Sequence, residues 1–278
     1  MMMSIAASVA ISSSPFAMRH SLPGIRLANI SAGSLDVLSP FGHLSVFHAH
    51  MLHPDPTAPL IVWMNGGPGA SSLGGFFTEL GPYLLNSNSK PKAGQSADEW
   101  TLFSNPSAWS HIGSLLVWEQ PAGVGFSRCV TDCPKQWNDT SSAIANVHTL
   151  LAFYEKYPSE RSRDLILAGE SYAGIYVPLL AQQVLGSSSL RGVRLRAIAV
   201  GDGCIGYGVT GACGADSLNL FVTTLERVAP GVSRAALAAV RSGCTKAELT
   251  SGRQPGQLST GCAEVIAELF KEVGEYNE

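Results

Sequence analysis

One serine of this chain stands in a setting that suits a nucleophile. Ser171 lies in the stretch GESYAG, from Gly169 to Gly174, between an apolar run and a helix-like run. A tight turn from strand to helix lifts a serine side chain off a sheet, and the amide of the next residue then points at a developing oxyanion. The pattern predicts a nucleophilic serine, with an ordinary turn as the alternative interpretation.

A glycine-rich loop could complete such a site. The sequence NGGPGASS begins at Asn65, directly after the apolar run from Leu60 to Met64. Consecutive glycines let the backbone approach a ligand and present N–H groups to it. In α/β-hydrolases the second oxyanion donor comes from a loop in this place. A phosphate-binding loop is the rival interpretation, but the stretch lacks a G-K-[ST] sequence and has no lysine near it.

The elements that must position these two loops alternate along the chain. Continuous apolar runs are typical of strands covered on both faces, and they occupy residues 60–64, 114–118, 164–168 and 195–200. Partial alternation marks a further strand at 44–51. Residues 140–157 have helical periodicity, which Pro158 ends, with a predicted buried stripe of Ala145, Val147, Leu150, Leu151 and Tyr154. The pattern predicts an α/β fold with a mostly parallel sheet flanked by helices.

The pattern changes after Gly203. Residues 217–228, 233–240 and 262–273 are predicted to form short helices, and no clear strand follows. We therefore predict three segments: residues 1–21 as a leader or disordered start, 22–204 as the N-terminal part of an α/β core, and 205–278 as a partial helical insertion or cap. Cys244 and Cys262 could staple the last segment.

Composition narrows the class of protein. The chain has 278 residues, a formal net charge of −3, 45% hydrophobic and 14% charged residues. These values suit a globular protein and favour neither nucleic acid nor an anionic membrane as a partner. No stretch has the roughly 18 uninterrupted apolar residues of a membrane span. The N-terminus is small and mildly apolar but lacks a basic n-region before Arg19, so a weak secretory leader and a disordered start are equal alternatives.

The cysteines and two sequons indicate an oxidising compartment. There are six cysteines, an even number, and glycosylation sequons begin at Asn29 and Asn138. Together they favour the secretory pathway over the cytosol. No paired C-x-x-C spacing supports a metal site, and any single cysteine could instead be free and buried.

Three long motifs closely resemble those of the serine carboxypeptidases. They are NGGPGASS from Asn65, WEQPAGVGFS from Trp118 and GESYAGIYVP from Gly169, and the match runs in order from about residue 22 to the end. The resemblance implies the α/β-hydrolase fold with a helical insertion. It also implies a glycosylated, disulfide-bonded protein of the vacuole, lysosome or cell exterior. Such a protein would remove single residues from the C-termini of peptides and proteins at acidic pH.

The resemblance implies roles for matching residues. Ser171 would be the nucleophile, and Gly67 and Tyr172 would donate the oxyanion amides. The substrate carboxylate would be held by Asn65, by the Gly66 backbone, by Glu170 and by Glu79, which would pair with Glu170. Two close carboxyl groups cannot easily both ionise, so one would keep a proton and donate a hydrogen bond to the substrate carboxylate. A surface glutamate at 79 and a turn residue at 170 are the alternatives.

The chain departs from the family pattern at a few positions. Ala70 stands where many members have a disulfide cysteine, and Glu119 replaces the usual aspartate. Cys129 and Cys133 form a short pair for which the resemblance offers no role.

The catalytic base is missing from the expected place. The α/β-hydrolase order is serine, then an acid, then histidine, whereas all seven histidines precede Ser171. We expect the family's aspartate and histidine beyond residue 278, so that the chain is an N-terminal piece. His48 and His50 share one face of a predicted strand, near His53. They could chelate a metal, but an exposed strand face is favoured, and neither a metal nor a cofactor is expected.

Three functions therefore remain open from sequence. The first is a serine carboxypeptidase that works through an acyl-enzyme. The second is an inactive fragment or pseudoenzyme that binds peptide carboxylates. The third is a carboxypeptidase-like acyltransferase, which shares the same motifs. Residue preference and oligomeric state are left open.

Overall fold

The computed structural model describes residues 30–91, 94, 101–204, 217–228, 231–250 and 257–273. The predicted leader at 1–21 and the sequon at Asn29 lie outside these residues. The chain divides between Asp202 and Gly203 into two compact units, and each is described here by itself.

The first unit is built on a mixed sheet that has seven strands among the described residues. Its order is β1-β2-β6-β3-β8-β9, with β7 also paired to β2. The strands are β1 (Ile30–Ser39), β2 (Gly42–Met51), β3 (Leu60–Met64), β6 (Ser114–Trp118), β7 (Arg128–Thr131), β8 (Asp164–Glu170) and β9 (Arg194–Gly201). The pairs β6–β3, β3–β8 and β8–β9 are parallel. The pairs of β2 with β1, β6 and β7 are antiparallel.

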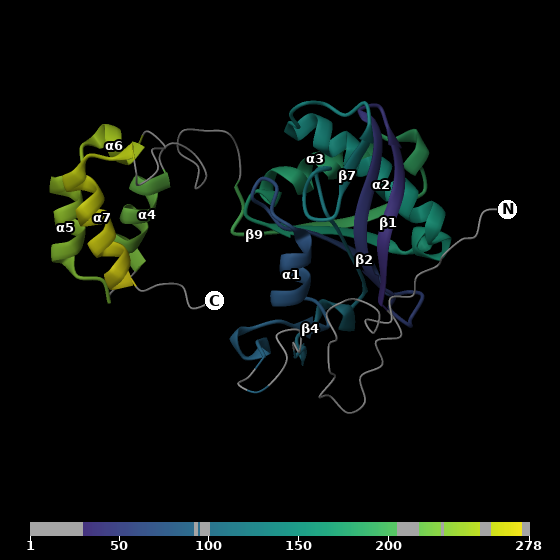
Figure 1. Cartoon of the computed structure of the whole chain (residues 1–278), viewed down its shortest axis with the longest axis horizontal. Coiled ribbons are helices and arrows are strands. Elements are labelled where there is room, and N and C mark those ends of the chain that lie inside the picture. Colours follow the sequence, from purple (N-terminus) through teal and green to yellow (C-terminus); the bar gives the residue numbers. More distant parts are fainter. Residues whose placement is uncertain are drawn as a thin grey trace. The chain divides into compact units, whose positions relative to one another are not determined.

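Helices cover both faces of this sheet. Figure 1 shows α1 (Ser72–Thr78) on one side and both α2 (Asp139–Lys156) and α3 (Ala173–Gly186) on the other. Every residue of β3 and β6 is buried, as expected of apolar strands between two helical layers. Short elements complete the unit: β4 (Tyr83–Leu84), β5 (Phe103–Ser104) and the 3₁₀ turns Ser87–Ser89, Trp109–His111, Pro158–Ser162 and Ser188–Leu190.

The α2 helix begins and ends where local chemistry dictates. The Asn138 side chain accepts a hydrogen bond from the Ser141 amide, and the Ser141 hydroxyl accepts one from the Asn138 amide, which makes a capping box. Pro158 starts the next turn and cannot continue the helix. The predicted stripe is buried except at Leu151, which is half-buried.

The second unit is helical in its described residues. It contains α4 (Ser217–Val228), α5 (Arg234–Gly243), α6 (Lys246–Thr250) and α7 (Thr260–Val273). Their apolar faces form a separate core that includes Val222, Leu237 and Ile266. A disulfide joins Cys244 to Cys262, as predicted, and a second one joins Cys129 to Cys133 in the first unit.

The prediction of an exposed strand face for His48 and His50 is wrong. Both rings are buried, at 0% and 2% exposure. They pack against Phe153 and Tyr157 at the end of α2, because this helix covers that face of β2. Burial lowers the pKa of His48 to about 4. Among the described residues, no group of three or more His, Cys, Asp or Glu side chains could hold a metal ion.

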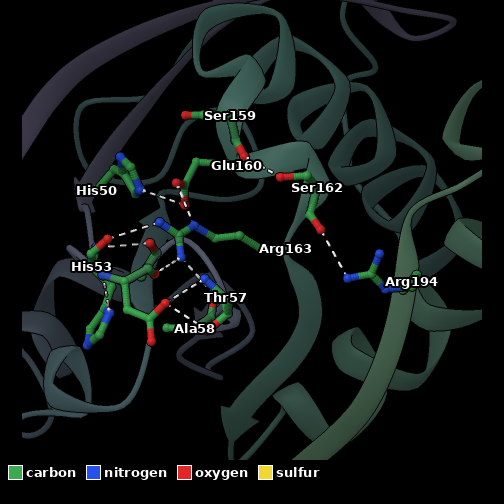
Figure 2. A network of polar contacts seen from close by, with 11 residues as sticks. His50, His53, Thr57, Ala58, Ser159, Glu160, Ser162, Arg163 and Arg194 are labelled. Carbon is green, nitrogen blue, oxygen red and sulfur yellow. Dashed lines mark hydrogen bonds and ion pairs between the residues drawn. The ribbon is translucent and has the colours of Figure 1, made fainter.

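A buried ion pair explains how His50 is accommodated. Its Nε2 lies 3.2 Å from Glu160 Oε2, and Glu160 Oε1 accepts a hydrogen bond of 2.8 Å from Arg163 Nε. Figure 2 shows the Arg163 guanidinium reaching on to the loop after β2, where it donates to the carbonyls of His53, Asp55 and Ala58. These contacts fix the end of the sheet where β8 begins.

No helix among the described residues is both long enough and apolar enough to cross a bilayer.

Candidate active site

The sheet brings the two motif loops together. Strands β3 and β8 are parallel neighbours, and Met64 pairs with Gly169 at their carboxyl ends. The chain leaves both strands at the same edge of the sheet. The loop that starts at Asn65 therefore lies beside the turn that holds Ser171.

Ser171 occupies a sharp bend. Its φ is 55°, a left-handed conformation that is uncommon for a residue other than glycine. Its amide donates to the carbonyl of Gly201 on β9 at 3.0 Å, and its side chain is exposed. A Cβ at Gly169 would lie 2.4 Å from the Met64 oxygen and 2.5 Å from the Cβ of Ala173. The bend therefore needs small residues on both sides of the serine.

The glycine-rich loop touches this bend directly. A Cβ at Gly66 would lie 2.4 Å from the Tyr172 nitrogen and 2.8 Å from Ser171 Cβ, so no side chain fits there. The next residue, Gly67, has a φ of 108°, which also favours glycine. The loop closes with a hydrogen bond from the Ala70 amide to the Gly66 carbonyl at 3.1 Å. Gly66 thus lies against both Ser171 and Tyr172, and Gly67 follows it in the chain.

The side chain of Asn65 is held in one orientation. Its Oδ1 accepts hydrogen bonds from Trp63 Nε1 at 2.8 Å and from the Gly75 amide at 3.1 Å. Its Nδ2 therefore faces the other way and donates to Glu170 Oε1 at 2.7 Å. Trp63 and Gly75 were not identified from sequence, because nothing in their spacing shows that they converge on Asn65.

Glu79 joins the same cluster. It follows α1 as the C-cap. Partial burial raises the pKa of Glu79 above its ordinary value, and the charge of Glu170 and a hydrogen bond with Glu170 raise it further, whereas a hydrogen bond from Asn65 opposes them. Asn105 Nδ2 donates to the carbonyls of Glu79 and Gly81 at 3.0 and 2.9 Å, which fixes the turn.

Glu119 links the glycine-rich loop to the loop after β6. Its side chain is 1% exposed. One carboxylate oxygen contacts the Ser71 hydroxyl at the N-cap of α1, and the other accepts a hydrogen bond of 2.6 Å from the Phe126 amide. A Cβ at Gly125 would collide with this carboxylate. The departure from the usual aspartate is therefore accommodated in a closely packed loop.

Comparison with known proteins decides the family. Residues 46–211 match the family model described as serine carboxypeptidase. The chain belongs to the serine carboxypeptidase family.

Several curated proteins are similar to part of the chain. Serine carboxypeptidase-like 36 of Arabidopsis thaliana is 38% identical over 171 residues, which are 61% of this chain and 33% of that protein. Lysosomal protective protein of Mus musculus is 42% identical over 154 residues, 55% of this chain and 30% of that protein. The chain thus spans about a third of the length of the curated relatives that it matches.

A solved structure supports the fold. The crystal structure of Kex1(delta)p, a prohormone-processing carboxypeptidase from Saccharomyces cerevisiae, aligns with a TM-score of 0.56 and 23% identity. The alignment covers 90% of this chain and 54% of that one. The predicted α/β-hydrolase fold of the serine carboxypeptidases is confirmed.

The histidines do not take part in the described contacts of Ser171. His48 and His50 are engaged by Gly33, Tyr157 and Glu160. Elsewhere in the first unit, His111 is exposed and His148 is half-buried on α2. Among the described residues, the hydrogen bonds of the histidines go to groups other than Ser171.

Proposed function

We propose that this protein is a serine-type carboxypeptidase that hydrolyses C-terminal peptide bonds through an acyl-enzyme on Ser171. The observation that carries the proposal is the cluster of Asn65, Glu170 and Glu79 beside the serine bend. An amide that donates and a carboxyl with a raised pKa form a receptor for a carboxylate when that carboxyl is protonated. In this proposal the amides of Gly67 and Tyr172 stabilise the oxyanion, and the Gly66 backbone also contacts the substrate carboxylate.

The position of this receptor gives exopeptidase specificity. Glu170 directly precedes Ser171 in the sequence. A substrate carboxylate bound at Asn65 and Glu170 would therefore lie close to the serine. Only the last peptide bond of a substrate would then reach the hydroxyl. An internal segment has no carboxylate in that place and would leave the buried Asn65 amide with a poorer partner.

The raised pKa of Glu79 supports a preference for acidic pH. Below that pKa the carboxyl is protonated and donates to the substrate. As pH rises through it, the group ionises beside Glu170 and repels the substrate carboxylate. Binding would therefore weaken on the alkaline side.

Two measurements test the proposal. A fluorophosphonate probe at about pH 5 should label the protein at Ser171, and Ser171→Ala should abolish the labelling. Hydrolysis should be seen with a peptide that has a free C-terminus and not with the same peptide amidated. Labelling that survives Ser171→Ala, or equal cleavage of the amidated peptide, would contradict the proposal.

A second candidate function is binding of peptide carboxylates without hydrolysis. The cluster of Asn65, Glu170 and Glu79 could hold a carboxylate whether or not Ser171 is reactive. Retained affinity for free-carboxylate peptides without any serine labelling would select this function.

We also propose a compartment and a role for the second unit. The two disulfides and the exposed sequon at Asn138 support an oxidising, secretory compartment. The name of the mouse relative places that protein in the lysosome. We propose that residues 205–278 form a helical insertion of the hydrolase core, in keeping with the helices α4 to α7. Peptide mapping of secreted protein, before and after glycosidase, tests the compartment at Asn138.

A further inference from the structure

A pocket of about 270 Å³ opens beside the serine bend. Its wall includes Pro68 and Gly69 from the glycine-rich loop and Tyr172, which follows the serine. The remaining wall comes from Tyr176 on α3 and from the start of α2 with the loop before it. Asn138, the sequon residue discussed above, also lies in the wall, but no substrate group has been assigned to this space.

The pocket and the carboxylate receptor lie on opposite sides of the sheet edge. The receptor is anchored from the α1 side, because Gly75 of α1 binds Asn65 and Glu79 caps that helix. The pocket is walled by α2 and α3, which cover the other face (Figure 1). A substrate whose carboxylate is held by the receptor would cross the bend and place its preceding residue, on the acyl side, toward the pocket.

The pocket wall combines aromatic rings with one carboxylate. Trp137, Tyr172 and Tyr176 supply the rings, and Asp139 is the one charged side chain among its lining residues. The rings of Tyr172 and Tyr176 pack edge to face, with centroids 5.2 Å apart. Aromatic faces beside a carboxylate attract cations.

The Asp139 carboxylate is held in place. Its Oδ1 accepts a hydrogen bond of 3.0 Å from the Tyr172 hydroxyl. It lies in the first turn of α2, where the helix dipole favours a negative charge. Its field is felt across the pocket, since burial and the charge of Asp139 together raise the pKa values of Tyr172 and Tyr176. Among the residues that the structure describes, no lysine, arginine or histidine lines the pocket.

We propose that this pocket binds the cationic side chain of a lysine or arginine that precedes the C-terminal residue of the substrate. The inference rests on the proposed function, because it uses the carboxylate receptor to orient the peptide. A volume of about 270 Å³ lies just below the range of pockets for whole small molecules and suits a single long side chain. The aliphatic stem would lie along the rings and the charge beside Asp139.

The test measures peptide binding to a variant that cannot hydrolyse its substrate. The full chain carrying Ser171→Ala is titrated with two peptides that end in the same residue, one with lysine and one with norleucine before it. Norleucine keeps the aliphatic stem and lacks the charge. We expect the lysine peptide to bind about tenfold more tightly at low salt, and the difference to shrink as salt is added.

A second substitution locates the effect. Asp139→Asn, which keeps the size of the side chain, should bring the two peptides to equal affinity. All variants are made without glycosylation, because this change creates a sequon with Thr140 and Ser141. The matched control is Asp132→Asn, because Asp132 is exposed, lies outside the pocket wall and has a φ of 61° that asparagine tolerates. Equal affinities in the parent protein, a preference that survives Asp139→Asn, or no binding of either peptide would each overturn the inference.

The outcomes also separate this inference from the proposed function. A protein that prefers the lysine peptide through Asp139 but is never labelled at Ser171 refutes hydrolysis and keeps the pocket. A protein that hydrolyses both peptides with equal kcat/KM keeps the carboxypeptidase and loses the cationic subsite. Should Asp139→Asn fail to fold, the two peptides on the parent protein still decide.

Discussion

Adding one methyl group at Gly66 tests the contact on which the site depends. In Gly66→Ala the new Cβ would lie 2.4 Å from the Tyr172 nitrogen and 2.8 Å from Ser171 Cβ, whereas ordinary contacts lie at 3.4–4 Å. The two loops must therefore separate by about 1 Å to relieve the overlap. Since both atoms belong to short bends held by the sheet, the strain falls on the site itself.

The size of the effect follows from this displacement. A misplacement of about 1 Å costs about 100-fold in rate, and loss of one oxyanion donor costs about 100- to 1,000-fold. We expect kcat/KM to fall at least 100-fold. The free energy of unfolding should also fall by about 1–3 kcal/mol, as for other overpacked sites.

The assay compares the rate of fluorophosphonate labelling of Ser171 and kcat/KM for a free-carboxylate peptide, well below the melting temperature of each variant. Gly74→Ala is the control, because a Cβ there meets nothing within 4 Å. This change lies in the exposed face of α1 and should stabilise the protein by about 0.5–1 kcal/mol without slowing labelling. A Gly66→Ala variant with rates within about threefold of the parent would refute the proposed contact of the loop with the oxyanion donors.

Two further predictions concern carboxyl groups. Glu79→Gln keeps a hydrogen-bond donor at every pH, so the rise of KM that the parent shows as pH passes through the raised pKa of Glu79 should flatten, as a KM profile from about pH 4 to 8 would show. Arg163→Met leaves the buried Glu160 without its cation and should cost about 3–5 kcal/mol in urea unfolding. In the parent, burial raises the pKa of Glu160, but hydrogen bonds from His50 and Arg163 outweigh burial and lower this pKa overall. The stabilisation that ionised Glu160 gives the folded protein is therefore present above the pKa of Glu160 in the unfolded chain, and it is lost as pH falls through the pKa of Glu160 in the folded protein. Arg194→Met, at an exposed pair, should cost about 1 kcal/mol or less and is the control; equal losses in the two variants would contradict this account.

Much of the fold could be predicted because the strands carry strong local signals. The run at 60–64 is apolar throughout and that at 114–118 is apolar after Ser114, and β3 and β6 have these bounds. The strand β1 was not predicted as an element, since its sequence ISAGSLDVLS mixes glycine, serines and an aspartate. It is a strand because it pairs over its whole length with β2, and such pairing is a tertiary property.

The error at His48 and His50 has the same origin. Alternation places both rings on one face of β2, and the sequence shows that much. Whether that face meets water or a helix depends on where α2 packs. A polar side chain such as histidine suggests exposure to solvent. Here Tyr157 and Glu160, which lie more than 100 residues away in the sequence, provide hydrogen-bond partners for the two buried histidines.

The candidate site shows why motifs alone do not fix geometry. GESYAG and NGGPGASS each specify a bend, yet neither states the distance between the bends. That distance is set by the register of β3 against β8, in which Met64 pairs with Gly169. A slip of one residue would turn every side chain of one strand to the opposite face and would move Asn65 away from Glu170, which it now contacts at 2.7 Å. The register is held in turn by helices on both faces, so the chemistry at Ser171 depends on the packing of the whole first unit.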